Sequence, residues 1–326
     1  MAKLQFCEIE NARVRIAEHV LRTPLIFSHS LSKKLGVDIA LKPEFLQETG
    51  SFKIRGATNA MLSLPESKRK FGVATASSGN HGPALAFAST KLKTKSVICL
   101  SEMVPKNKIE NVLTNGGTVQ IKGHDYDSCL EACMDLVRKE RLHLVHPFDD
   151  PFVIAGAGTI GLELIEDSKR DLDCVLVPLS GGGLLAGVAT AIKSLAPHTR
   201  IIGVSMEKGA SMYGSIKAGK PINVKEVDTI ADALGGNIGI DNKWTFQTVQ
   251  ELVDDIVVVE DEIIKKAMRE IFYSVGFMIE GAGAVGIAAL MSGSISTRGK
   301  IACILSGRNI ESEKFLNILN KQENFQ

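Results

Sequence analysis

The sequence lacks the long apolar runs and leader features of membrane and exported proteins. No apolar stretch approaches the roughly 20 residues that a membrane helix needs. Residues 1–20 alternate charged with apolar side chains and lack the apolar core of a signal peptide. No low-complexity linker divides the chain. These absences predict a soluble protein with no membrane partner, and we expect it in the cytoplasm.

An excess of charge of one sign is also missing. The chain has 38 Lys and Arg against 37 Asp and Glu, a net charge of +1, and its charges are dispersed. A nucleic-acid-binding protein usually shows a basic patch or stripe. We therefore expect no nucleic-acid partner, and a small molecule as the ligand.

Paired cysteines are absent as well. The six cysteines form no CxxC pair, and Cys129 and Cys133 lie four residues apart without histidines nearby. Most of them sit in apolar runs, such as Ser96–Leu100 and Ile301–Leu305. This pattern favours free, buried thiols over zinc ligands or disulfides.

What the sequence does contain is a repeated alternation of strands and helices, which predicts parallel sheets covered by helices. A chain of 326 residues is long enough for two domains. We predict two open α/β lobes with twisted, mostly parallel sheets and an active-site cleft between them. The predicted strands include Asp38–Lys42, Gly72–Thr75, Ser96–Leu100, Thr118–Ile121, Leu142–Val145, Cys174–Pro178, Ile201–Ser205, Asp255–Val259 and Lys300–Leu305.

The sequence also predicts three helices that bear on the fold. One is expected over Asn11–Leu21, with Ile9, Ile16 and Val20 facing inward and Pro24 ending it. Another is expected over Thr159–Ser168, and the helix after the strand Cys174–Pro178 over Leu184–Ser194.

Three glycine patterns approach the G-x-G-x-x-G spacing. Those that begin at Gly156 and Gly281 follow no convincing strand, so tight helix packing is the favoured explanation. The pattern in Ser180–Gly187 follows a strand and opens a helix, which predicts a phosphate site. Glu207 at the end of the next strand would suit a dinucleotide-dependent dehydrogenase, whereas the mid-chain position and the longer glycine spacing oppose it.

Gly50–Gly56 places Lys53 beside Phe52 at the expected start of a helix. A lysine there is either an ordinary surface residue or one whose pKa is lowered for Schiff-base chemistry. Spacing alone leaves both interpretations open.

Four motifs in order resemble the fold-type II pyridoxal-phosphate enzymes, whose fold is similar to the tryptophan synthase β subunit. The chain is most similar to their serine/threonine dehydratase and serine racemase branch, and the likeness runs from Leu21 to Ile310. The motifs are Gly50–Gly56, Ser77–Gly82, Ser180–Gly187 and Ser306–Asn309.

This resemblance implies pyridoxal 5'-phosphate as cofactor and a role for each matching residue. Lys53 would form the Schiff base and abstract the substrate Cα proton, with Ser78 as a second acid/base on the opposite face. The other cofactor contacts would come from Phe52, Asn80, Ser180, Gly181, Gly182, Gly183, Leu184, Glu280 and Ser306. The turn that receives the substrate carboxylate would consist of Ser77, Ser78, Asn80 and His81.

Two departures from the family pattern limit these expectations. Members with a divalent-cation site carry an Asp six residues after a Glu, but Tyr213 stands six residues after Glu207. A single carboxylate is a poor site for a hard cation, so we expect no metal. The chain also ends at Gln326, without the regulatory domain of feedback-inhibited dehydratases, which implies a short catabolic type.

The resulting hypothesis is dehydration and deamination of a hydroxy-amino acid, such as L-threonine or L-serine, to a 2-oxo acid and ammonia. Residues 1–66 and 147–326 would form a large cofactor-binding domain and residues 67–146 a small substrate-gating domain, in a homodimer. Alternatives are serine racemisation, action on 3-hydroxyaspartate or on a larger hydroxyectoine-derived substrate, and cofactor binding without turnover. Met206–Tyr213 and Ala231–Asp241 are similar to a subgroup of hydroxyectoine-utilisation dehydratases.

Overall fold

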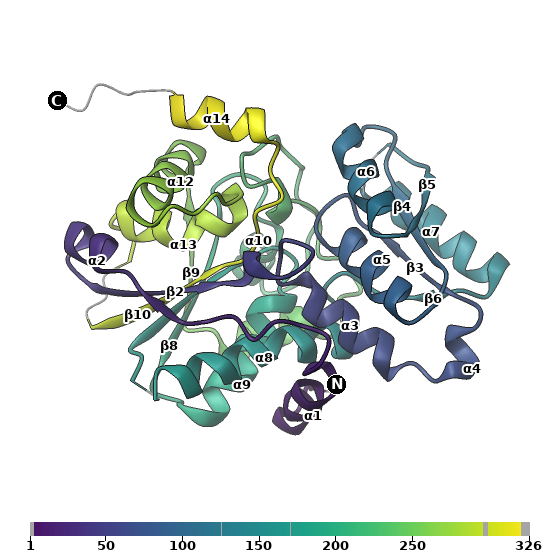
Figure 1. Ribbon diagram of the computed structural model, residues 1–326, viewed down its shortest axis with the longest axis horizontal. Coiled ribbons are helices and arrows are strands. Elements are labelled where there is room, and N and C mark those ends of the chain that lie inside the picture. The colour runs from purple at the N-terminus through teal and green to yellow at the C-terminus, as the bar shows by residue number, and fades with distance from the viewer. Residues whose placement is uncertain (1–2, 125, 170, 296–298, 321–326) are drawn as a thin grey trace.

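The computed structural model describes residues 3–124, 126–169, 171–295 and 299–320, which form two sheets flanked by helices (Figure 1). The larger sheet has the order β1-β2-β10-β7-β8-β9, and all its strand pairs are parallel except β1 with β2. Its strands are β1 (Ile26–Phe27), β2 (Asp38–Pro43), β7 (Cys174–Pro178), β8 (Arg200–Met206), β9 (Asp255–Val259) and β10 (Lys300–Leu305).

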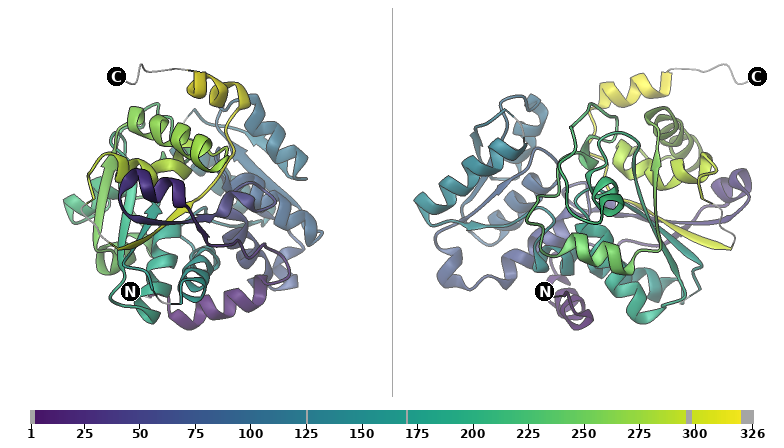
Figure 2. Two further views of the ribbon diagram at one scale, coloured as in Figure 1. Left: turned by 60° about the vertical axis from the view of Figure 1, so that its left-hand side comes forward. Right: turned by 180° about the vertical axis from the view of Figure 1, so that it is seen from behind.

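The smaller sheet has the order β5-β4-β3-β6 and is parallel throughout. It lies beside the larger sheet with its own helices, as Figure 2 shows from two further directions. Its strands are β3 (Val73–Ala76), β4 (Ser96–Leu100), β5 (Thr118–Ile121) and β6 (His143–Leu144). We call the two halves the large lobe and the small lobe.

Helices cover both faces of the larger sheet. Alternate residues of β7 point to opposite faces, as the pleat of a strand requires. Cys174 and Leu176 pack in the cluster of α12 (Asp261–Val275) and α13 (Gly281–Met291). Val175 and Val177 pack with α8 (Pro151–Asp167) and α9 (Gly183–Leu195). The strands are therefore apolar on both sides, which accounts for their continuous hydrophobic runs.

The remaining helices flank the lobes or cap their edges. Their bounds are α1 (Phe6–Ile16), α2 (His29–Leu35), α3 (Lys53–Ser63), α4 (Glu66–Arg69), α5 (His81–Lys91), α6 (Lys106–Thr114), α7 (Tyr126–Glu140), α10 (Ser211–Ala218), α11 (Thr245–Leu252) and α14 (Ser312–Asn320), with single 3-10 turns η1 (Glu44–Leu46) and η2 (Asp232–Leu234). No helix of the described segments is both long and apolar enough to cross a membrane.

The predicted architecture is confirmed, but two helix boundaries were wrong. The first helix spans Phe6–Ile16 rather than Asn11–Leu21, because Gln5 and Glu8 form a capping box that starts it earlier. The helix predicted from Thr159 begins at Pro151. The Asp150 side chain caps it by accepting hydrogen bonds from two backbone N–H groups, and Pro151 occupies its first turn.

The glycines of α8 confirm the prediction of tight packing. A Cβ atom on Gly156 would lie 2.5 Å from the carbonyl oxygen of Arg55, and one on Gly158 would lie 2.9 Å from that of Gly187. Gly281 behaves similarly, since its Cβ would lie 2.3 Å from the carbonyl oxygen of Ile230. These glycines let helices and neighbouring backbone approach closely.

The small lobe is formed by a segment inserted between two parts of the large lobe, so no single position in the chain separates the two. The strands of the small lobe fall within residues 73–144. The division at residues 66 and 146, and the gating role of the small lobe, stay predictions.

Candidate active site

Lys53 is the first residue of α3 and extends into a cavity between the lobes. Its Nζ donates a hydrogen bond of 2.7 Å to the carbonyl oxygen of Pro147 and lies 5.3 Å from the centre of the Phe52 ring. Desolvation by the surrounding protein lowers the pKa of Lys53 to about 8. Lys53 is therefore not an ordinary surface lysine, and a large fraction of it is neutral in mildly alkaline solution.

The cavity has a volume of about 190 Å³ and brings several predicted residues together. One wall comes from the turn between β3 and α5, and another from the segment that precedes α8. The residues that matter below are Lys53, Ser77, Ser78, Gly79, Asn80, His81, Lys108, Pro147, Phe148, Ser180 and Asp232, all of which line it.

The Ser180–Leu184 loop connects β7 to α9, and its glycines leave no room for side chains. A Cβ atom on Gly181 would lie 2.4 Å from the Phe148 ring, and one on Gly183 would lie 2.9 Å from the Phe148 carbonyl oxygen. Gly182 has a φ of +89°, which strongly favours glycine. Because α9 begins at Gly183, the first N–H groups of the helix have no partners within it. The loop is built to hold an anion against backbone N–H groups.

The turn between β3 and α5 carries the predicted substrate-binding residues. Ser77 and Asn80 are buried, whereas Ser78 is exposed at the cavity wall. The Ser77 N–H donates to the carbonyl oxygen of Cys99, which ties the turn to β4.

Asn80 connects this turn to the large lobe. Its Nδ2 donates to Glu280 Oε1 at 2.7 Å, and its Oδ1 accepts from Asn309 Nδ2 at 2.7 Å. Glu280 precedes α13 and is almost fully buried. Burial, reinforced by the negative charge of Asp232, raises the pKa of Glu280 to about 7. Its second oxygen, Oε2, is buried without a hydrogen-bond partner.

His81 is fully buried at the start of α5. Burial, reinforced by the positive charge of Lys53, holds the pKa of His81 well below its usual value, so the ring is neutral. Its Nε2 lies 3.3 Å from the Val145 carbonyl oxygen, which can only accept, so Nε2 carries the proton. Nδ1 is then an acceptor, and it is buried without a partner.

Ser306 directly follows β10 and is buried. Its carbonyl oxygen accepts a hydrogen bond of 3.0 Å from the Phe52 N–H, while Ser51 pairs with Gly307 in a short bridge. These bonds join the end of a central strand to the start of α3. They bring Ser306 next to the lysine motif, although Ser306 and Lys53 are 253 positions apart in the chain.

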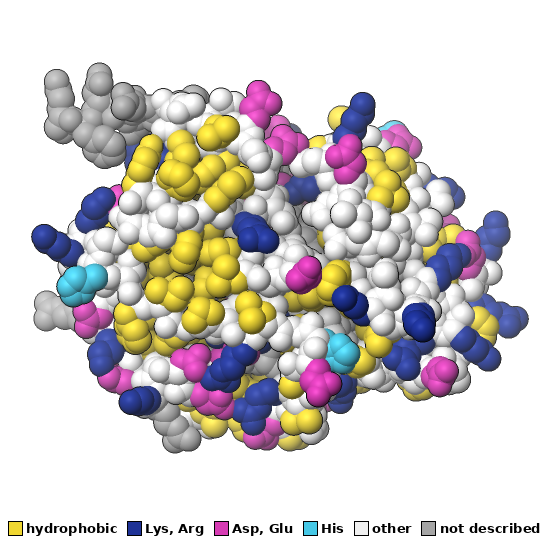
Figure 3. All heavy atoms as spheres, viewed as in Figure 1, with side chains coloured by type: hydrophobic (Ala, Val, Ile, Leu, Met, Phe, Trp, Pro, Cys, Tyr) yellow, Lys and Arg dark blue, Asp and Glu magenta, His cyan; other side chains and the backbone are white. Residues whose placement is uncertain are grey.

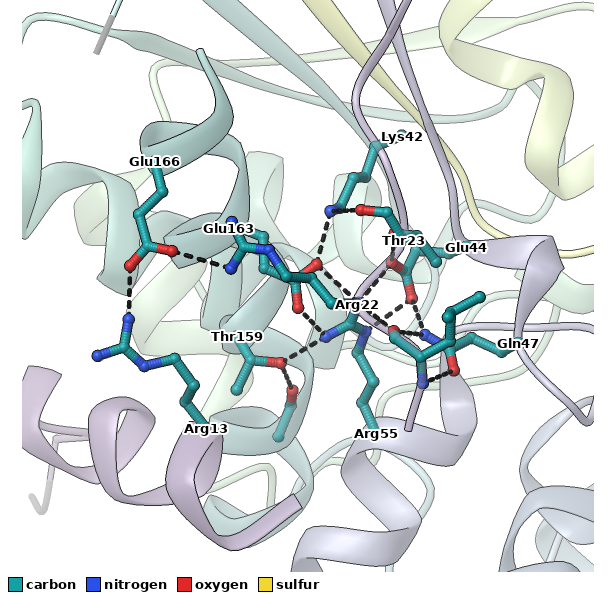
Figure 4. A network of polar contacts seen from close by, with 12 residues as sticks. Arg13, Arg22, Thr23, Lys42, Glu44, Gln47, Arg55, Thr159, Glu163 and Glu166 are labelled. Carbon is teal, nitrogen blue, oxygen red and sulfur yellow. Dashed lines mark hydrogen bonds and ion pairs between the residues drawn. The ribbon is translucent and has the colours of Figure 1, made fainter. Parts of the chain in front are cut away.

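A buried network of charges around Arg55, two residues after Lys53, anchors α3 (Figure 4). The Arg55 guanidinium donates to Glu44 and Glu163, with distances of 2.6–2.9 Å. Lys42 Nζ donates to Glu163 Oε2, which also accepts from Arg55, at 2.6 Å, and it donates to the Thr23 carbonyl oxygen. The network binds the first turn of α3 to β2, η1 and α8.

Several groups at the site carried no clear signal in the sequence. Pro147 contributes only its carbonyl oxygen, and Phe148 fills the space that the missing glycine side chains leave. Asn309 belongs to a matched motif, but its bond to Asn80 depends on the tertiary fold. Lys108 and Asp232 meet across the cavity at 3.4 Å. No short sequence pattern predicts such contacts.

Comparison with known proteins agrees with this geometry. A family profile described as "Pyridoxal-phosphate dependent enzyme" matches residues 16–307. The chain belongs to this family. Within it, the chain falls in the threonine dehydratase and serine racemase branch, and its cofactor is pyridoxal phosphate.

Three relatives illustrate the similarity. A threonine dehydratase homologue of Sinorhizobium fredii is 48% identical over 321 residues, covering 98% of this chain and 96% of the relative. An L-threonine ammonia-lyase of Geobacter sulfurreducens is 41% identical over 310 residues, covering 94% of this chain and 76% of the relative. The structure of maize serine racemase superposes with a TM-score of 0.91 at 34% identity, covering 97% of both chains. Placement in the hydroxyectoine subgroup stays a prediction.

The residues present fit pyridoxal phosphate. Lys53 supplies an amine with a lowered pKa, and the glycine loop supplies helix-terminal N–H groups in a loop that packs too closely on Phe148 to admit side chains at Gly181 and Gly183. Three buried polar atoms nearby have no hydrogen-bond partner in the protein: Glu280 Oε2, His81 Nδ1 and Ser51 Oγ. Buried polar atoms in native proteins are normally paired, so these point to a polar ligand.

The prediction that no metal binds is based on Glu207 and Tyr213, which do not line this cavity. Glu207 directly follows β8, and Tyr213 lies in α10 with Lys217 Nζ 4.3 Å from its ring centre. Metal independence stays a prediction.

Proposed function

We propose that this chain is a pyridoxal-phosphate-dependent threonine ammonia-lyase, which also accepts L-serine. The observation that carries the proposal is Lys53, whose lowered pKa and position in a cavity beside the Ser77–His81 turn suit proton abstraction from an amino acid. The names of the Sinorhizobium and Geobacter relatives support the same substrate class.

The matched residues then divide into those that bind the cofactor and those that bind the substrate. Backbone N–H groups of Ser180–Leu184 would hold the phosphate, Phe52 and Asn80 would contact the ring, and the Ser306 hydroxyl would meet the pyridine nitrogen. Glu280 would lie near the ring. The turn residues Ser77, Ser78, Asn80 and His81 would bind the substrate carboxylate.

The reaction follows from what these residues can do. The bound cofactor supplies an electron-withdrawing ring that acidifies the substrate Cα–H. Lys53 Nζ, with a pKa of about 8, would accept that proton near neutral pH. The neutral Ser306 hydroxyl does not enforce a positive charge on the ring nitrogen, which favours prompt departure of the β-hydroxyl. Threonine would then yield 2-oxobutanoate and ammonia.

The test is an assay of the purified holoprotein with L-threonine and L-serine. We expect a 2-oxo acid and ammonia in equal amounts, and no dependence on an added nicotinamide cofactor. A holoprotein that forms no 2-oxo acid from either substrate would contradict the proposal.

Racemisation is the second candidate, because Ser78 lines the same cavity as Lys53 and could act on the opposite face of the substrate. The likeness to maize serine racemase supports it. Measuring D-serine formed from L-serine alongside deamination separates the two reactions. If the physiological substrate is a larger hydroxyectoine-derived compound, its kcat/KM should exceed those of threonine and serine.

We further propose a homodimer in the cytoplasm. Cys7, Cys99, Cys133, Cys174 and Cys303 are free thiols, and four of these five are buried, which suits a reducing compartment. Exposed hydrophobic side chains occur on β1, α12 and α14, at Phe27, Tyr273 and Leu316, and the face in Figure 3 shows hydrophobic area over this part of the large lobe. Light scattering of the wild type and of Tyr273→Glu tests this, and we expect the substitution to shift the mass toward the monomer.

A further inference from the structure

A salt bridge between the lobes lies on the wall of the active-site cavity. Lys108 belongs to α6 of the small lobe, and Asp232 begins η2, which packs on α13 of the large lobe. Lys108 Nζ lies 3.4 Å from Asp232 Oδ2, and both side chains line the cavity that contains Lys53 and Ser78. Asp232 also borders a second cavity of about 470 Å³ next to the first.

The charged side chains that line the cavity indicate which of them could meet the side chain of a substrate. Among the described residues that line it, the acidic and basic side chains are Lys53, Lys108, Asp232 and the neutral His81. Lys53 is committed to the cofactor and the turn at Ser77–His81 to the α-carboxylate. Lys108 is thus the remaining cation that could meet a charged substrate side chain, and Asp232 already neutralises it.

We propose that Asp232 makes the enzyme select hydroxy-amino acids with uncharged side chains, by neutralising Lys108 and repelling a second carboxylate. The proposal rests on the proposed function. It names the substrate class as serine- and threonine-like, and it excludes 3-hydroxyaspartate as an efficient substrate.

The physical basis is that specificity is a difference of affinities and can be set by repulsion. With the pair intact, this part of the wall carries no net charge, and a side-chain carboxylate would meet Asp232 as well as Lys108. Without the Asp232 carboxylate, the wall gains one unit of positive charge at Lys108. The half-exposed position of Asp232 limits the effect, because solvent screens it.

The test compares ligands that differ in one charge and in little else. L-Aspartate and L-asparagine are nearly isosteric, and neither carries a β-hydroxyl to eliminate. Their dissociation constants for the holoprotein can be read from the cofactor absorbance. In Asp232→Asn, we expect the affinity for aspartate relative to asparagine to rise about fivefold, the size of a half-exposed ion pair. The ratio of kcat/KM for 3-hydroxyaspartate over threonine should rise in parallel.

Two variants control the interpretation. Asp228→Asn removes the same charge four residues away, where the side chain borders the second cavity but not the active-site cavity, and we expect unchanged ratios. Lys108→Met should lower the aspartate-to-asparagine affinity ratio, and adding it to Asp232→Asn should abolish the gain. An Asp232→Asn holoprotein with unchanged ratios would overturn the proposal.

The outcome is separable from the proposed function. If the wild type deaminates neither threonine nor serine, the ammonia-lyase proposal fails, but the binding ratios still test Asp232. If the wild type deaminates threonine and the ratios do not respond to Asp232, only the selection by charge is refuted.

Discussion

Two clusters of buried ionisable groups lie on either side of the first turn of α3, and they differ in how completely the protein satisfies them. In the Arg55 network, Arg55 and Lys42 face Glu44 and Glu163, so two positive charges meet two negative ones at 2.6–2.9 Å. In the cavity, Lys53 faces no carboxylate among the described residues and donates its hydrogen bond to a carbonyl oxygen, while Glu280 and His81 each keep an atom without a partner. The first cluster is complete as a scaffold, and the second is completed only by a ligand.

The pKa values express the same difference. Burial alone would raise the pKa of Glu44, but the Arg55 guanidinium holds it below its usual value. In the cavity, burial dominates and moves the pKa of Lys53 down to about 8 and that of Glu280 up to about 7. Groups that titrate near neutral pH are the ones that catalysis can use.

Lys53→Ala should give the largest change in activity. We expect turnover to fall at least about a thousandfold, since the variant loses both the covalent attachment point and the base. Borohydride reduction of the wild type followed by peptide mapping should locate the cofactor on Lys53. Lys91→Ala, which removes an exposed lysine of α5, should retain full turnover. Labelling at another lysine would refute the assignment.

Arg55→Met should give the largest change in stability. The substitution leaves Glu44 and Glu163 buried without their main partner, and breaking a buried ion pair typically costs about 3–5 kcal/mol. Urea unfolding of the variant should show this loss. Arg13→Met removes an arginine of similar size from a half-exposed pair with Glu166 and should cost less than about 1 kcal/mol. Equal losses in the two variants would mean that the Arg55 network adds nothing specific to stability.

Glu280→Gln tests the cavity cluster through the pH dependence of the free energy of unfolding. The folded protein holds the pKa of Glu280 at about 7, above its ordinary value of 4.5, so folding opposes ionisation of this group. The cofactor-free wild type should therefore lose stability as pH rises from about 4.5 to 7, by about 3 kcal/mol at most. Glu280→Gln should lack this part of the pH dependence. Parallel stability curves for the two proteins would contradict the raised pKa.

The sequence predicted the cavity better than the scaffold. The motifs of the site follow strands or begin helices, so the local sequence is enough to predict where they lie in the fold. They are the motifs at Lys53, Ser77–Gly82, Ser180–Gly187 and Ser306. The parallel strands were equally readable, because burial on both faces makes each a continuous apolar run.

The Arg55 network was not predicted, since its partners are brought together only by the fold. The Arg55–Glu163 pair spans 108 residues. Short elements escaped prediction for the same reason. Helix α11, for example, is capped by the side chain of Asp149, which accepts the N–H groups of Trp244 and Thr245 from 95 and 96 residues away.

Ser78→Ala should have the smallest effect on threonine deamination and the sharpest effect on stereochemistry. Ser78 is exposed at the cavity wall, unlike the buried Ser77 and Asn80, so its hydroxyl is free to meet a substrate. A racemase needs an acid/base on each face of the planar intermediate, so that a proton removed from one face can return to the other. If Lys53 serves one face and Ser78 the other, the variant should deaminate the enantiomer whose Cα proton faces Lys53, with a raised KM. It should lose deamination of the opposite enantiomer and any racemase activity.

The measurement is kcat and KM for both enantiomers of serine and threonine, with the cofactor content checked by absorbance. A serine hydroxyl is a weak acid, so a role as carboxylate ligand alone is the competing explanation. That explanation predicts an equal loss on both enantiomers, because each presents the same carboxylate to the turn. A loss confined to one enantiomer would instead place Ser78 among the catalytic residues. The cavity would then hold two proton-transfer groups, where the Arg55 network holds none.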